Sequence, residues 1–255
     1  MTAGRAAQLT VLLALPAWAA DSAPVEPPLP GERLVMRFDY LHLAAGRGTL
    51  SVAADERNGK PVLRFVAEAR SEGFFAWLLR YRVRDRTDAW FDPLAGCSLG
   101  IEKHLREGRA VRDQVVTLDP AAGIASVNDP KIAETRFETG PCTLDVLSAV
   151  FVIRAQGVAE GRPLLLPLFD NGKRFTLRVD WIGRETLDLP PPFGKKTPTI
   201  VVEPILAEGT GLFVKRGRLK LWLTDDARRV PVRLRTRVPI GSVSGELESY
   251  EPGGR

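Results

Sequence analysis

The sequence contains little of the chemistry from which most enzyme active sites are built. Its 255 residues include two histidines, two cysteines and two methionines. His42 and His104 lie far apart and fit neither a His-x-x-x-His nor a Cys-x-x-Cys spacing, so the usual zinc motifs are excluded. No Gly-x-x-x-x-Gly-Lys loop occurs, which excludes a phosphate-binding loop of that type. We therefore expect no metal site, no cofactor and no enzymatic activity, with both histidines at the surface or hydrogen-bonded.

Charge of one sign is not concentrated anywhere in the chain. Lysine and arginine number 36 against 31 acidic residues, which gives a formal net charge of +5 and a sequence pI of about 9.5. Nucleic-acid-binding proteins normally gather basic residues on one face or helix, so charge alone does not predict a nucleic-acid partner. The excess is compatible with a weak attraction to anionic partners.

Long hydrophobic runs are also absent. A short apolar run, Leu9 to Leu15, follows the lone charge of Arg5, and Ala17 and Ala19 provide the small residues that a signal peptidase requires. No segment reaches the roughly 18 apolar residues of a membrane-spanning helix. We predict cleavage after Ala19 and an exported, soluble mature protein, periplasmic if the host is Gram-negative. The predicted divisions are a signal peptide over 1–19, a Pro-rich spacer over 20–31, one β-rich domain over 32–251 and a tail over 252–255.

The two cysteines, Cys97 and Cys142, suit an oxidising compartment. A disulfide between them is the predicted state, and closing a loop of this length would stabilise the fold by roughly 3–4 kcal/mol. Two separate buried thiols are the alternative. Because neither cysteine belongs to a Cys-x-x-Cys motif, a redox enzyme is not expected.

Period-two alternation of apolar and polar residues dominates the chain and predicts strands. It is strongest over 219–250, where Leu and Val alternate with Lys and Arg around a polar turn. Asn58-Gly59 and Asn171-Gly172 predict two-residue hairpins, and Gly46-Arg47-Gly48 predicts a further turn. Strands are predicted over 34–40, 50–54, 62–70, 80–86, 97–107, 110–118, 163–169, 174–182, 199–206, 219–223, 230–238 and 242–250.

One segment has helical spacing instead. Apolar residues recur from Leu144 to Phe151 and predict a helix over Thr143–Ala155, with Asp145 in the first turn, where the helix dipole favours a carboxylate. Further apolar residues on its other sides indicate a helix that is buried nearly all round. We therefore predict a mainly β fold, a curved antiparallel sheet or half-barrel of about ten to twelve strands with this helix at its centre.

Four short motifs occur in order along the chain. They are Gly31-Glu32, Asp145-x-Leu147-Ser148-Ala149 with Arg154, Trp222-Leu223-Thr224-Asp225-Asp226 with Arg229 and Pro231, and Ile240-Gly241-Ser242. In this order and spacing they resemble the exported bacterial family known as domain of unknown function 3108, over nearly all of the mature chain. The resemblance implies a β-rich envelope protein without an assigned biochemical role and supplies no catalytic residues. The sheet with its helix is also similar to the half-barrel of the periplasmic lipoprotein carriers, a likeness of fold that says little about function.

Aromatic residues and arginine stripes are the candidate ligand-binding features. The aromatic residues are bulky enough to line an apolar concavity between sheet and helix, with core packing as the alternative. Arginines at every second position share one strand face and suit phosphate or carboxylate groups; alternatively they pair with Glu68, Glu246 and Glu248 on a solvated face. The candidate residues are Phe74, Phe75, Trp77, Trp90, Trp181, Trp222, Arg80, Arg82, Arg84, Arg233, Arg235 and Arg237.

The sequence as a whole predicts a non-enzymatic periplasmic binding protein for a lipidic or anionic envelope ligand. The first alternative is a structural or assembly partner in the envelope, which would use exposed strand edges and the arginine faces. The second is a glycan or lipid hydrolase, which needs a pocket where acids converge with His42 or His104; Ser148 near Asp145 and the pair Asp225-Asp226 are the other candidate groups. A helix face produces the spacing of Ser148 and Asp145 in any case, and adjacent acids more often form turns.

Overall fold

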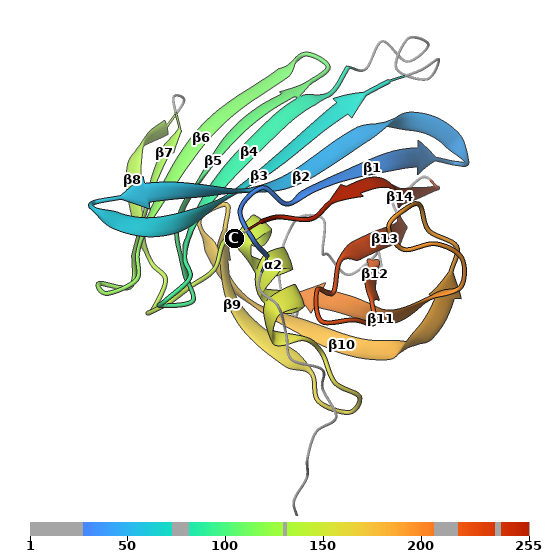
Figure 1. Ribbon diagram of the computed structural model, residues 1–255. Coiled ribbons are helices and arrows are strands. Elements are labelled where there is room, and N and C mark those ends of the chain that lie inside the picture. The colour runs from blue at the N-terminus through green and yellow to red at the C-terminus, as the bar shows by residue number, and fades with distance from the viewer. Residues whose placement is uncertain (1–27, 73–81, 130–131, 207–218, 238–240, 255) are drawn as a thin grey trace, which may run out of the picture.

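Alternating side chains build one long antiparallel sheet in the computed structural model, which describes residues 28–72, 82–129, 132–206, 219–237 and 241–254 (Figure 1). The predicted mainly β fold with one helix is confirmed for this part of the chain. The strands are β1 Arg33–Tyr40, β2 Leu43–Arg57, β3 Lys60–Ser71, β4 Arg84–Asp92, β5 Cys97–Glu107, β6 Ala110–Asp119, β7 Ile124–Asp129, β8 Ile132–Glu138, β9 Leu164–Asp170, β10 Lys173–Leu187, β11 Thr197–Leu206, β12 Lys220–Thr224, β13 Pro231–Arg237 and β14 Ser242–Glu251, and the helix is α2 Val146–Gln156.

The described strands join one 14-stranded sheet in the order β8-β7-β6-β5-β4-β3-β2-β1-β14-β13-β12-β11-β10-β9. The expected ten to twelve strands were too few, because β7 and β8 were not recognised. A register shift between Val127 and Asp129 breaks the period of two in this hairpin. Before this shift only Ala125 and Val127 share the buried face of β7, and two small apolar residues in a six-residue strand are too short a pattern to predict a strand.

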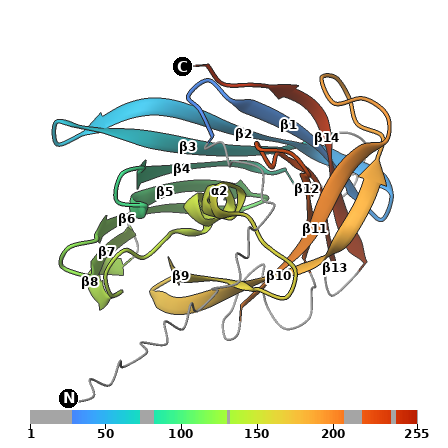
Figure 2. The same ribbon diagram turned by 60° about the horizontal axis from the view of Figure 1, so that its bottom comes forward.

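The sheet curls until its two edge strands, β8 and β9, come close together. The rings of Phe137 on β8 and Phe169 on β9 lie 5.7 Å apart. Arg112 Nη2 donates a hydrogen bond of 2.7 Å to Asn171 Oδ1 in the β9–β10 turn. Figures 1 and 2 both place α2 on the concave side of the curled sheet, so the helix occupies space that the strands enclose.

The helix begins at Val146, three residues later than predicted. Asp145 has an extended backbone and is the N-cap, outside the helix rather than in its first turn. The residue before it is not helical, because Leu144 forms a β-bridge with Leu168 of β9. The prediction of a helix buried on most sides is confirmed, because residues from α2 enter the cores of both halves of the sheet. Ala149 and Ile153 pack with β9 to β12, whereas Phe151 packs with β2 to β6.

The turn predicted at Gly46-Arg47-Gly48 was wrong, because all three residues lie inside β2. The chain reverses at Leu41 and His42 instead, both with positive φ. Gly46 and Gly48 are needed for close approach: a Cβ on Gly46 would lie 2.1 Å from the carbonyl oxygen of Arg70, and one on Gly48 would lie 2.6 Å from the ring of Phe38. The hairpins predicted at Asn58-Gly59 and Asn171-Gly172 are confirmed.

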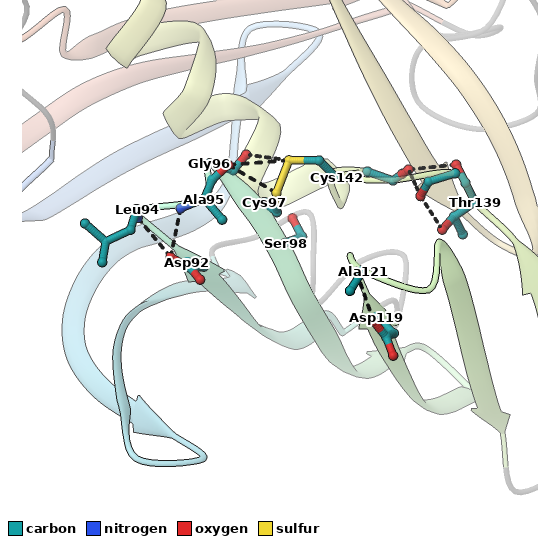
Figure 3. Close-up of a disulfide and its surroundings, with 12 residues drawn as sticks. Asp92, Leu94, Ala95, Gly96, Cys97, Ser98, Asp119, Ala121, Thr139 and Cys142 are labelled. Atoms are coloured by element: carbon teal, nitrogen blue, oxygen red, sulfur yellow. Dashed lines mark hydrogen bonds between the residues drawn. A yellow bond between two sulfur atoms is a disulfide. The ribbon is translucent and has the colours of Figure 1, made fainter.

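The predicted disulfide between Cys97 and Cys142 is present (Figure 3). It joins the first residue of β5 to the segment that leads into α2. Next to it, the backbone N–H of Asp145 donates to Ser98 Oγ at 2.9 Å. A covalent bond and a buried hydrogen bond therefore attach the start of the helix to the same strand.

Candidate functional site

The position of α2 depends first on a buried ion pair near its C-terminal end. Arg154 Nη2 and Nη1 donate to the two carboxylate oxygens of Glu32 at 2.7 and 3.0 Å, and the two side chains are 2 % and 3 % exposed. Tyr250 donates its hydroxyl hydrogen to Glu32 Oε1 at 3.0 Å. Burial, followed by the charge of Glu32, raises the pKa of Tyr250 to about 12. Two residues named in separate motifs, Glu32 and Arg154, therefore form this pair although they are 122 positions apart in the sequence.

The β12–β13 turn reaches the same end of the helix. Asp226 Oδ1 accepts hydrogen bonds from the backbone N–H groups of Arg228 and Arg229 and from the hydroxyl of Thr224. The carbonyl oxygen of Arg228 accepts a bond of 3.3 Å from Arg154 Nη2. A Cβ at Gly157, which caps the helix, would lie 2.8 Å from the Arg229 guanidinium. The Asp225-Asp226 pair therefore belongs to a turn that holds the helix.

The start of the helix is fixed by a buried carboxylate. Asp145 Oδ1 accepts from the N–H groups of Leu147 and Ser148, and Oδ2 accepts from the Ser148 hydroxyl at 2.5 Å. Burial raises the pKa of Asp145, although these hydrogen bonds oppose the rise. The Ser148–Asp145 pair thus acts as an extended N-cap.

A Gly-x-Ser-x-Gly sequence, Gly96 to Gly100, went unrecognised in the sequence. Its Ser98 is fully buried at the start of a strand, next to the disulfide, and not on a strand-to-helix turn. His104 lies elsewhere, with its ring nitrogens 2.8 Å from Asp113 and 2.9 Å from Glu102. Among the described residues, no serine is therefore paired with a histidine.

A row of side chains on the concave face continues beyond the helix. Residues directly opposite each other in an antiparallel sheet point to the same face of the sheet. Val202 packs in the core cluster that includes the helix, so the residues in register with Val202 lie on the concave face. Trp181 and Leu221 pack at the edge of that core, while Leu234 and Phe38 belong to none of the buried clusters and are half-buried. From β10 to β2 this row, the concave row, is Trp181, Val202, Leu221, Leu234, Gly245, Phe38 and Gly46.

Glycines shape the middle of the concave row. A Cβ at Gly245 would lie 2.8 Å from the ring of Phe38 and 3.0 Å from Leu234, and one at Gly48 would also meet the ring. The Phe38 ring therefore occupies the space above glycines on both neighbouring strands. The result is a smooth apolar surface, of which only Trp181 was predicted as a site residue.

The predicted aromatic residues do not share one environment. Trp181 belongs to the concave row, whereas Trp222 is buried in a different cluster and donates from Nε1 to Glu185 at 2.8 Å. Trp90 donates from Nε1 to Asp55 at 3.0 Å, and the guanidinium of Arg57 lies 3.8 Å from its ring centroid. Phe74, Phe75, Trp77 and Arg80 lie outside the described residues.

The predicted arginines divide into paired and unpaired groups. Arg233 pairs with Glu246 at 3.0 Å, as the solvated-face interpretation expects. Arg86 likewise pairs with Glu68, and Glu248 pairs with Arg47, which was in no predicted stripe. The remaining four are exposed and form no ion pair with any described residue. They are Arg82, Arg84, Arg235 and Arg237.

Two pockets among the described residues lie beside the seam between β8 and β9. One of about 180 Å³ is lined by Gln114, Phe137 and Asn171, and another of about 430 Å³ by Ile124, Glu138 and neighbouring residues. No predicted site residue lines either pocket. Within the described ranges we find no cluster of three potential metal ligands, and no helix there has the length and apolar character needed to cross a bilayer.

Comparisons with known proteins agree with this picture of the fold. No curated protein matches the sequence. A crystal structure described as a β-barrel-like protein of domain of unknown function DUF1849, from Brucella abortus, superposes with a TM-score of 0.58 over 89 % of this chain and 100 % of that one, at 12 % identity. At that identity the likeness concerns the fold alone. The sequence model described as "Protein of unknown function (DUF3108)" matches residues 35–248, and the chain therefore belongs to the DUF3108 family.

Proposed function

We propose that the protein is a non-enzymatic periplasmic binding protein that holds a lipidic or anionic envelope ligand on the concave face of its sheet. The observation that carries this proposal is the part of the concave row that extends past the helix, at Leu234 and Phe38. Apolar side chains on a concave surface that are only half-buried are suited to an acyl chain. The disulfide is compatible with the oxidising periplasm.

The lengths of α2 and β2 also support a ligand on the concave face. The 11 residues of α2 span about 16 Å. The 15 residues of β2 span about 50 Å, so the helix covers only part of the concave face. On this half of the sheet the helix shares a buried cluster with Val52, Phe65 and Ala89, which form one row across β2, β3 and β4. Leu234 and Phe38 lie outside the two clusters that the helix joins, which supports a ligand at this part of the face.

Native mass spectrometry tests the proposal directly. The chain is expressed with its leader in a bacterial periplasm, purified without detergent, measured intact and then extracted with organic solvent. We expect a bound mass of lipid size that is lost in Leu234→Glu, because a carboxylate on the concave face repels an apolar chain. Leu165→Glu is the matched control, since Leu165 is exposed on β9 and outside the concave row. A bare polypeptide mass for the unaltered protein would contradict the proposal.

One observation favours an assembly partner as the second candidate. Within the described sheet, β8 pairs with another strand on one side only, while the outer side of β9 is bonded in part by Leu144. An edge such as that of β8 can accept a strand from another chain. A polypeptide that co-purifies with the protein in place of lipid would favour this candidate.

A further inference from the structure

Four arginines form a row across the convex face. The register sets Arg37 opposite Arg47, Arg47 opposite Arg70, and Arg70 opposite Arg84. Directly opposite residues share a face, and all four side chains are exposed. Strands are about 4.8 Å apart, so four positive charges follow one another over about 15 Å.

Acidic residues neutralise only part of this row. Arg47 is paired with Glu248 and Glu72, and Arg37 is 3.9 Å from Asp39 and 4.0 Å from Glu246. Arg70 and Arg84 have no acidic partner among the described residues. Like charges placed directly opposite each other destabilise a sheet. The row is therefore a feature that folding alone does not favour.

A second basic group lies on nearby strands. Arg235 of β13 stands directly opposite Lys220 of β12, and neither has an acidic partner in the described part of the chain. Arg237 ends β13 and pairs in register with Ser242 of β14. The N–H of Leu41 donates to the carbonyl of that same Ser242 at 3.1 Å. The β1–β2 turn therefore lies beside the end of β13.

That turn carries exposed apolar side chains. Leu41 and Leu43 are 45 % and 50 % exposed. Leu41 and His42 have φ values of 50° and 67°, a region where bulky residues are uncommon and where glycine or asparagine is usual. Two leucines are thus displayed at the tip of a hairpin instead of the small polar residues that such a turn favours.

We propose that this end of the barrel docks on the surface of an anionic lipid bilayer. The docking surface consists of Arg37, Arg47, Arg70, Arg84, Lys220, Arg235, Arg237, Leu41 and Leu43. The basic residues face the anionic head groups, and the leucines enter the interface between head groups and acyl chains. Charge complementarity favours a membrane over a neutral apolar partner. The observations here are separate from those that carry the ligand proposal, and each can fail without the other.

Vesicle flotation tests the docking surface. The mature protein is mixed with vesicles of phosphatidylglycerol and phosphatidylcholine in equal parts, or of phosphatidylcholine alone. We expect flotation with the anionic vesicles only, and loss of flotation as salt rises and shortens the screening length. Because each basic side chain near an anionic surface strengthens partitioning about five-fold, Arg70→Glu with Arg84→Glu should weaken it by about 20-fold or more.

Matched variants separate the surface from total charge. Lys60→Glu with Lys195→Glu makes the same change of charge at the opposite end. Lys60 lies beside the β2–β3 turn, on the other side of the sheet from the β1–β2 turn (Figure 1), and Lys195 precedes β11 at the end where Thr199 pairs with Thr224 of β12, away from Lys220. This variant should stay within about three-fold of the unaltered protein. Arg70→Lys with Arg84→Lys should retain flotation, and Leu41→Ser with Leu43→Ser should reduce it without changing its salt dependence.

Three results would overturn the proposal. They are absence of flotation with anionic vesicles, equal losses in the two charge-reversed variants, and binding of an envelope protein through these arginines without any vesicle binding. Circular dichroism and thermal unfolding confirm that each variant is folded before it is compared. Both arginine variants keep like charges opposite each other at positions 70 and 84, and Arg70→Glu places a carboxylate opposite Arg47, so only a small change of stability is expected from them.

Discussion

The concave and the convex side of the curled sheet each carry an arginine–glutamate ion pair, in very different surroundings. Arg154 and Glu32 form a two-bonded pair on the concave side, almost fully buried. Arg47 and Glu248 form a two-bonded pair on the convex side, at 2.6 and 3.0 Å, with side chains 47 % and 38 % exposed. Their geometry is alike, so the difference between them is the solvent. Water screens the outer pair, whereas each inner charge depends on its partner.

The comparison also explains why residues of the four short sequence motifs lie where they do. Glu32, Asp145, Arg154 and Asp226 all act on one element, the helix, from its start or its end. None of these four residues belongs to the concave row. We therefore read these motif residues as the structure that holds α2 in place, leaving the remaining concave surface as the candidate for ligand binding.

Removal of one inner charge should give the largest effect. Glu32→Gln leaves the Arg154 guanidinium buried without its counter-charge, and we expect the free energy of unfolding to fall by about 3–5 kcal/mol. Urea denaturation measures the change. Glu72→Gln, which removes an exposed carboxylate that pairs with Arg47, is the matched control and should cost less than about 1 kcal/mol.

Loss of the disulfide should come next. Cys97→Ser with Cys142→Ser opens a loop with a sequence separation of 45, and chain entropy predicts a loss of about 4 kcal/mol. The same denaturation series measures it. If the variant were as stable as the unaltered protein, the covalent attachment of the helix start would be irrelevant to the fold.

Alkaline pH should lower the free energy of unfolding through Tyr250, which contacts the inner ion pair and not the outer one. Its pKa is raised from 10.0 to about 12, so the folded state holds this proton more tightly than the unfolded state does. The resulting stability is present below pH 10 and is lost as pH rises towards 12. Tyr250→Phe should lower stability at neutral pH by about 1.5–3 kcal/mol, because Glu32 loses a hydrogen bond, and should remove this alkaline slope. A slope that persists in Tyr250→Phe would contradict the assignment.

The outer pair should give the smallest effect. The hydrogen bond from Arg47 lowers the pKa of Glu248, but both groups face solvent. Arg47→Met should change the free energy of unfolding by less than about 1 kcal/mol, and high salt should erase the change. Thermal unfolding at low and high salt measures it. A large, salt-independent loss would show that the two environments are not as different as their exposures indicate.

Local patterns predicted most of the fold. Alternation identified twelve strands, and helical spacing identified α2, because each signal lies within about a dozen residues. The strands β7 and β8 were missed where a register shift interrupts the alternation. Gly46 and Gly48 were misread as a turn, since nothing local shows that the ring of Phe38 and the carbonyl of Arg70 approach them.

The candidate site was much less predictable. Trp181 was identified by its size alone, while its neighbours in the concave row come from strands that only the register brings together. The pairing of Glu32 with Arg154 joins residues 122 positions apart, which no local spacing encodes. Similarly, the arginine row draws one residue from each of four strands, so period-two stripes within single strands could not reveal it.

A pair of double-mutant cycles tests most directly the claim that the inner pair holds the helix. One cycle combines Glu32→Leu with Arg154→Met, and the other combines Glu248→Leu with Arg47→Met, each followed by urea denaturation. We predict a coupling energy of at least about 2 kcal/mol for the inner pair and less than about 1 kcal/mol for the outer pair. Equal coupling energies in the two cycles would contradict the claim.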